Sequence, residues 1–151
     1  MLFLLSLVDR MFARLLGRIR RGGAPTLSIR RVHTTLPTPD PDRLRPFYEG
    51  VLGLAPYAVR PGAVLYRVGA GSLFAISRTG NRATGGHTQM SFTVPDIDAE
   101  VAELRSRGVV FENYDTPKTE AGIARLPVGR AAWFKDPDGN LIGILQFDDP
   151  A

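Results

Sequence analysis

The feature that most constrains the fold of this chain is an internal repeat, in which the second half repeats the pattern of the first. Leu36-Pro-Thr-Pro-Asp-Pro-Asp42 matches Phe92-Thr-Val-Pro-Asp-Ile-Asp98, and a helix-like stretch follows each copy. Further on, Tyr66–Ala75 matches Phe134–Gly143. The first pair is 56 residues apart (36 to 92) and the second pair 68 (66 to 134), so the second copy carries a longer loop between its helix and its last hairpin. The repeat therefore predicts two equal modules that share one core.

Hydrophobic periodicity and turn residues predict the same element order, βαβββ, in both modules. The predicted elements of the first module are a strand over Ser28–Leu36, a helix with its N-cap at Asp42, and strands over Pro56–Arg60, Ala63–Val68 and Ser72–Ser77. Those of the second are a strand over Thr88–Val94, a helix over Asp98–Arg107, and strands over Val109–Tyr114, Arg130–Lys135 and Leu141–Phe147. The fold class is therefore predicted as α+β, with two βαβββ modules forming a curled eight-stranded mixed sheet.

Composition places one domain after a basic extension. Residues 1–25 carry five arginines and one aspartate, which accounts for the formal net charge of +4. The remaining residues are balanced, so nothing in them favours nucleic acid as a partner. We expect residues 28–148 to form the domain, with module one at 28–78 and module two at 87–148.

The absence of cysteine limits the chemistry of the chain. It excludes disulfides, thiolate metal ligands and a cysteine nucleophile. This composition fits a reducing compartment, and a cytoplasmic location is predicted.

The segment from Met1 to Ile19 has the pattern of a short amphipathic helix, with apolar residues at helical spacing. Its arginines follow the apolar run, unlike those of a secretory signal, and the run Leu2–Val8 is too short to span a bilayer. Two interpretations remain open. Residues 1–19 form a peripheral membrane or partner-docking helix, or they are a dispensable extension.

Three sequence segments resemble those of a known superfamily: Val32–Leu36, Phe47–Leu54 and Ala132–Asn140. In this order they are similar to the vicinal oxygen chelate superfamily, which includes glyoxalase I, extradiol dioxygenases, and fosfomycin and bleomycin resistance proteins. The resemblance covers about residues 28–148. It implies a sheet that curls around a cavity, but the fold hosts many reactions as well as binding proteins.

The resemblance places the four metal-ligand positions of the superfamily on His33, Ala75, Gln89 and Gly143. The repeat relates the same residues in pairs, His33 to Gln89 and Ala75 to Gly143. Ala75 and Gly143 supply no side-chain ligand, so no metal or other cofactor is expected. If a metal binds, its predicted ligands are His33, Gln89 and His87.

Strand alternation divides the side chains near these positions into two sets. The apolar set is predicted to face the helices: Phe74, Ile76, Met90, Phe92, Val94, Ile142 and Ile144. The small or polar set is predicted to line the cavity: His33, Thr35, Ala75, Ser77, Gln89, Ser91, Gly143 and Leu145. The sequence does not assign the facing of Arg67, Arg125 and Arg130.

Two aromatic residues on neighbouring strands, Tyr114 and Trp133, are candidates for stacking on a ligand. The cavity-lining set contains no Lys or Arg, so a planar apolar ligand is expected rather than a phosphate or nucleotide. The predicted ligand-binding residues are His33, Thr35, Ala75, Ser77, Gln89, Ser91, Tyr114, Trp133 and Gly143.

These features predict a metal-free protein that binds a small organic molecule. The alternative is a divalent-metal-dependent lyase or dioxygenase of the glyoxalase type with a rearranged site. A third hypothesis is metal-independent catalysis with His33 as the base. A homodimer is predicted because the exposed edge strands of a half-closed sheet invite pairing.

Overall fold

The computed structural model describes residues 32–80 and 86–148. The predictions for residues 1–25 and for the start of the first strand therefore lie outside the described residues. Residues 33–80 and 86–148 belong to one compact unit. Within the described ranges, no helix is long and apolar enough to cross a membrane.

Module one contains β1 (Thr34–Thr38), α2 (Pro41–Arg45), the π-helix η1 (Pro46–Val51), β2 (Pro56–Arg60), β3 (Ala63–Val68) and β4 (Ser72–Arg78). Module two contains β5 (Met90–Thr93), α3 (Ile97–Ser106), β6 (Thr119–Glu120), β7 (Ile123–Leu126), β8 (Gly129–Lys135) and β9 (Leu141–Phe147). The predicted α+β class and the two modules are confirmed.

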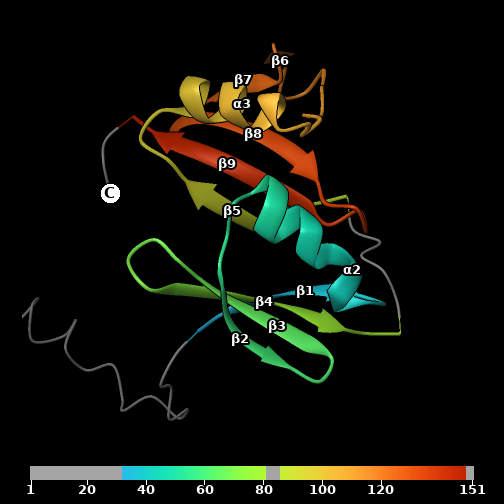
Figure 1. The fold of residues 1–151 in the computed structure, drawn as a ribbon. Coiled ribbons are helices and arrows are strands. Elements are labelled where there is room, and N and C mark those ends of the chain that lie inside the picture. Colours follow the sequence, from blue (N-terminus) through green and yellow to red (C-terminus); the bar gives the residue numbers. More distant parts are fainter. Residues whose placement is uncertain (1–31, 81–85, 149–151) are drawn as a thin grey trace, which may run out of the picture. The chain divides into compact units, whose positions relative to one another are not determined.

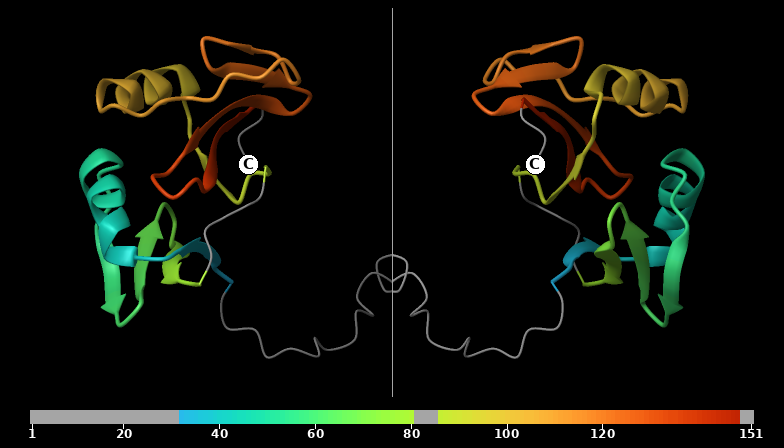
Figure 2. Two further views of the ribbon diagram at one scale, coloured as in Figure 1. Left: turned by 90° about the vertical axis from the view of Figure 1, so that its right-hand side faces the viewer. Right: turned by 90° about the vertical axis from the view of Figure 1, so that its left-hand side faces the viewer.

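The strands of the described residues are divided between two sheets, one for each module. The first has the order β1-β4-β3-β2 and the second β5-β9-β8-β7-β6. β1 pairs in parallel with β4, and β5 pairs in parallel with β9. All other strand pairings are antiparallel. Figure 1 shows the sheets one above the other, with β1 and β5 as the facing edges. The helices lie on the same side of both sheets (Figure 2).

Both helices start earlier than the sequence predicted. Asp40 caps α2 by accepting a hydrogen bond from the backbone N–H of Asp42, so the prediction of Asp42 as N-cap was wrong. Proline at position 41 is the reason, because it suits the first helical position directly after the cap. The matching Asp96 caps α3. In both modules the helix therefore begins just before the predicted residue.

The predicted strand over Val109–Tyr114 is reduced to an isolated bridge between Phe111 and Phe134. The reason is that β7, which was not predicted, already pairs with the first half of β8. The segment before β6 reaches only the remaining half, where the Glu112 N–H donates to the Trp133 carbonyl.

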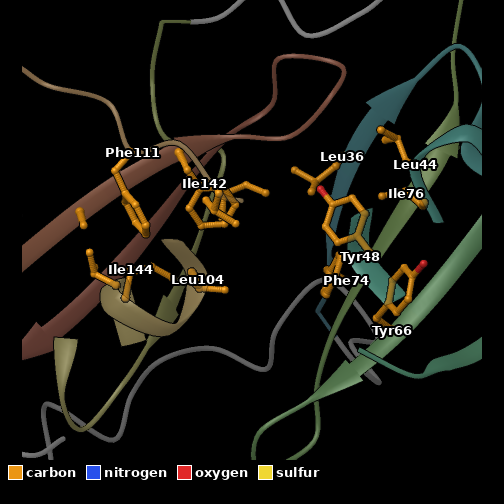
Figure 3. Packing of buried hydrophobic residues seen from close by; sticks show 14 of the residues in the cluster. Leu36, Leu44, Tyr48, Tyr66, Phe74, Ile76, Leu104, Phe111, Ile142 and Ile144 are labelled. Atoms are coloured by element: carbon orange, nitrogen blue, oxygen red, sulfur yellow. The ribbon is translucent and has the colours of Figure 1, made fainter. Parts of the chain in front are cut away.

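One apolar core joins the two modules. It contains helix-facing residues of both sheets and buried residues of η1 and α3. Figure 3 shows Leu36 and Tyr48 of module one and Ile142 of module two pointing toward one another. Aromatic contacts cross between the modules, with ring centroids 6.1 Å apart for Phe74 and Phe92. The predicted helix-facing set is confirmed: Phe74, Ile76, Ile142 and Ile144 are buried, and Met90, Phe92 and Val94 pack against them.

The turn between β8 and β9 links module two to module one through buried polar groups. The Asp136 carboxylate accepts from the backbone N–H groups of Asp138 and Asn140, each at 2.9 Å. It also accepts from the Tyr48 hydroxyl at 2.8 Å. Burial and the adjacent carboxylate raise the pKa of the Tyr48 hydroxyl, which therefore stays protonated and donates.

The second carboxylate of the turn, Asp138, also bonds to module one. It accepts from the Thr38 hydroxyl at 2.5 Å and forms an ion pair with Arg43. The side-chain amide of Asn140 donates to the Pro37 carbonyl at 3.1 Å. The turn is thus fixed against the end of β1 and the start of the first helix.

Removing the Tyr48 hydroxyl tests this link. Tyr48→Phe leaves the buried Asp136 carboxylate with one donor fewer, and we expect a loss of about 1.5–3 kcal/mol in the free energy of unfolding. Tyr57→Phe, at a side chain 52% exposed, is the matched control and should change it by less than about 0.5 kcal/mol. Urea unfolding measures both. Equal stability of the two variants would contradict the proposed link.

Candidate functional site

The candidate site lies on the faces of the two sheets that point away from the helices, here called the open faces. Register aligns Thr35 with Ala75 and Ala75 with Leu65 across β1, β4 and β3. The repeat places the corresponding row of module two on Ser91, Gly143 and Trp133, across β5, β9 and β8. Along each strand, the residues of these rows alternate with core residues. Each row therefore lies on the open face of its own sheet.

The two rows differ in the bulk of their last member. Module one has Leu65 where module two has Trp133, and only Trp133 is accompanied by a second aromatic ring. The Tyr114 ring meets Trp133 edge to face, with centroids 5.6 Å apart and planes at 76°. The indole N–H donates to the Thr88 hydroxyl at 3.0 Å. These contacts fix the orientation of the indole on the open face.

A pocket of about 220 Å³ lies beside this aromatic pair. Its lining combines the ring faces with small polar groups and a histidine: Gly86, His87, Thr88, Tyr114, Thr116, Pro117, Trp133 and Leu141. The structure therefore brings together three residues that the sequence singled out, Tyr114, Trp133 and His87. The pocket belongs to module two alone.

The four predicted metal-ligand positions do not fit a divalent metal. The Gln89 side-chain oxygen already accepts from the backbone N–H of Leu141 at 3.0 Å. His33 is exposed and directly precedes β1. At Gly143, an added Cβ would lie 2.6 Å from the Ser91 hydroxyl oxygen. Among residues 32–80 and 86–148, no three His, Asp or Glu side chains form a group that could hold a metal ion.

The remaining predicted residues of module one do not line the pocket beside Trp133. Thr35 is exposed, Ala75 is buried, and Ser77 lies between these extremes in β4. By register, Ser77 pairs with Pro37 of β1 and with Ala63 of β3. These residues place small side chains on the open face of module one.

Among the cations on the open faces are Arg67 and Lys135, which the sequence did not assign to them. Arg67 pairs with Leu73 in register and lies over the Tyr57 ring, 3.9 Å from its centroid. Lys135, at the matching position of module two, forms an ion pair with Glu112 at 3.1 Å. The sequence left the facing of Arg67 open, and the register places it on the open face of module one.

The other two arginines are engaged in bidentate ion pairs. Arg130 binds Asp98 of α3, at 2.5 and 2.6 Å, and lowers the pKa of that carboxyl group. Arg125 binds Asp148 at 2.7 and 2.8 Å. Both guanidinium groups are therefore already neutralised by carboxylates.

Residues 30–144 match the family described as the glyoxalase/bleomycin resistance protein/dioxygenase superfamily. The chain belongs to this superfamily. No match was found among curated proteins.

Several solved structures are similar to this chain. One is TnmS3, an antibiotic binding protein from Streptomyces sp. CB03234, at 28% identity and a TM-score of 0.63, covering 81% of this chain and 99% of that one. A superfamily member from Sphaerobacter thermophilus DSM 20745 is 28% identical, with a TM-score of 0.62 and coverage of 80% and 99%. A fosfomycin resistance protein from Listeria monocytogenes shares the fold at 16% identity, with a TM-score of 0.60 and coverage of 80% and 94%.

Several residues that line the pocket beside Trp133 were not predicted from the sequence. Thr88 was predicted only as the start of a strand, yet it orients the indole. Thr116 and Pro117 lie in the long loop of module two, where no periodic pattern assigns a facing. The length of that loop was the available signal, because long loops in compact domains are often functional.

A substitution of Gly143 tests the crowding at this predicted ligand position. Gly143→Ala should lower the free energy of unfolding by about 1–3 kcal/mol, because the new methyl group displaces the Ser91 hydroxyl. The loss should shrink in a Ser91→Gly background, measured as a double-mutant cycle. Gly50→Ala is the control, since its Cβ would meet no atom within 4 Å. An additive cycle would show that Ser91 does not fill this position.

Proposed function

We propose that this protein binds a small planar organic ligand on the open face of module two, without a metal. The observation that carries the proposal is the oriented pair of Tyr114 and Trp133 at the wall of a pocket. Aromatic rings held in one orientation offer stacking area at little cost in side-chain entropy.

The size and chemistry of the pocket indicate the class of ligand. A cavity of about 150 Å³ is enough to hold benzene, so about 220 Å³ admits one ring or two fused rings. The hydroxyl groups of Thr88 and Thr116 and the imidazole of His87 provide hydrogen-bonding partners at its wall. No Lys or Arg lines the pocket, which favours a neutral ligand over a phosphate or nucleotide.

The donor set supports a metal-free protein. Two of the superfamily's ligand positions hold Ala75 and Gly143, and the oxygen of Gln89 is engaged with the backbone. Hard divalent ions prefer carboxylate oxygens, which these positions lack. His33 is the remaining side-chain donor at these positions, and a single imidazole without a carboxylate does not make the ligand set of a metal-dependent lyase or dioxygenase.

The relatives are consistent with this proposal. An antibiotic binding protein is among the similar structures, and its sequence is 28% identical to this chain. We infer that this chain has a comparable role as a binding protein, with a ligand of its own.

Fluorescence of the chain's single tryptophan reports directly on the proposed site. A neutral bicyclic probe, 2-naphthamide, should quench Trp133 emission in a saturable manner. Tyr114→Ala should weaken this binding about two- to ten-fold, the worth of one aromatic contact. Val110→Ala, at a side chain 79% exposed, is the control and should not change the affinity.

Two further outcomes test the metal-free part of the proposal. Binding should be unchanged after dialysis against a chelator, and adding zinc or manganese should not restore or increase it. The absence of quenching at about 1 mM probe, or equal binding by Tyr114→Ala, would place the ligand elsewhere.

A homodimer is also proposed. The edge strand β2 carries two exposed apolar side chains, Tyr57 at 52% and Val59 at 47%. Exposed apolar edges favour association with another chain. Light scattering should give twice the mass of the chain, and Val59→Lys should shift the protein toward monomer. A monomer at high protein concentration would refute this proposal.

A further inference from the structure

A second pocket lies on the helix side of the molecule, where the two modules meet. Its volume is about 220 Å³. Module one supplies side chains from the end of η1, the following loop and β3, and module two supplies them from β5, α3, β8 and β9. The lining residues are Leu52, Leu54, Val68, Phe92, Thr93, Val94, Glu100, Leu104, Phe134 and Ile144.

The walls of this inter-module pocket are apolar and only partly covered. Leu52, Leu54 and Val68 are half-buried side chains that pack against the core from module one. Phe92 and Val94 are equally half-buried on the module-two side. A ligand that covered these side chains would gain about 25 cal/mol for each Å² of apolar surface removed from water.

One residue of the lining carries a charge, Glu100 on α3. The neighbouring acidic residues on α3 are engaged, Asp98 with Arg130 and Glu103 with Arg107. Among the described residues, no ion pair involves Glu100, and no Lys or Arg lines the pocket. Glu100 is half-buried, so its charge acts through a medium of lower dielectric than water.

We propose that the inter-module pocket binds a small apolar cation, with the apolar part against Leu104 and Ile144 and an ammonium group on Glu100. The carboxylate selects the charge, and the aliphatic and aromatic walls select the apolar body. This site lies on the opposite side of the sheets from the Trp133 pocket and is independent of the proposed function. Figure 3 shows Leu104 on the side of module two that faces module one, with Ile144 behind it.

Benzylamine and benzyl alcohol form a matched pair of probes, equal in shape and different in charge. Titration followed by methyl NMR should shift the resonances of Leu104, Ile144 and Val68. Glu100→Gln should weaken benzylamine binding about two- to ten-fold and leave benzyl alcohol unchanged. Glu103→Gln, the same change one turn further along α3, should leave both affinities unchanged.

A second variant keeps the test independent of the carboxylate. Val68→Phe fills the pocket from its rim and should abolish binding of both probes. Emission from Trp133 should stay constant throughout, because the indole lies on the other face of the sheet. No shift of the pocket methyl groups at about 10 mM benzylamine, or equal benzylamine binding by wild type and Glu100→Gln, would overturn the proposal.

Discussion

The buried carboxylates of the β8–β9 turn are the interaction on which the arrangement of the two modules depends. Asp136 and Asp138 belong to module two, yet their partners include Tyr48, Thr38 and Arg43 of module one. An apolar core favours association without fixing direction, because hydrophobic burial depends on area and not on angle. A buried charge is different, since each missing partner is costly. The turn therefore selects one relative placement of the modules from those that the core alone allows.

This placement determines where each kind of pocket arises. The helix-facing side chains of both sheets meet in the common core, so the other side chains of the strands, among them Ser91 and Trp133, lie on the open faces. On module two, Ser91, Gly143 and Trp133 form one row across the sheet. Because Gly143 has no side chain, Ser91 and the Thr88 methyl group approach its backbone closely. Ser91 and Thr88 thus occupy the space that a side chain at position 143 would need.

The fold was predictable because the repeat gives each element twice. The strands over Pro56–Arg60, Ala63–Val68 and Leu141–Phe147 were predicted with their observed bounds. The failures occurred where the copies differ, above all between α3 and β8. There, the short strands β6 and β7 form from a segment without periodicity. The predicted strand over Val109–Tyr114 forms only a bridge to β8, because β7 pairs with the first half of β8. Strand alternation gave the facing of Gly143 and Ser91, but alternation does not reveal that Gln89 turns its oxygen toward the backbone.

The wall of the aromatic pocket comes partly from the segment that module one lacks. Tyr114, Thr116 and Pro117 all lie in the longer connection of module two, whereas Trp133 and Leu141 belong to the shared sheet. This connection is anchored at its far end, where Arg105 donates to the Ala121 carbonyl. Loops held by a rigid scaffold tolerate changes in sequence and length better than the scaffold itself. Substitutions in residues 113–118 would therefore reshape the wall of the aromatic pocket, while the duplicated framework that folds the chain stays untouched.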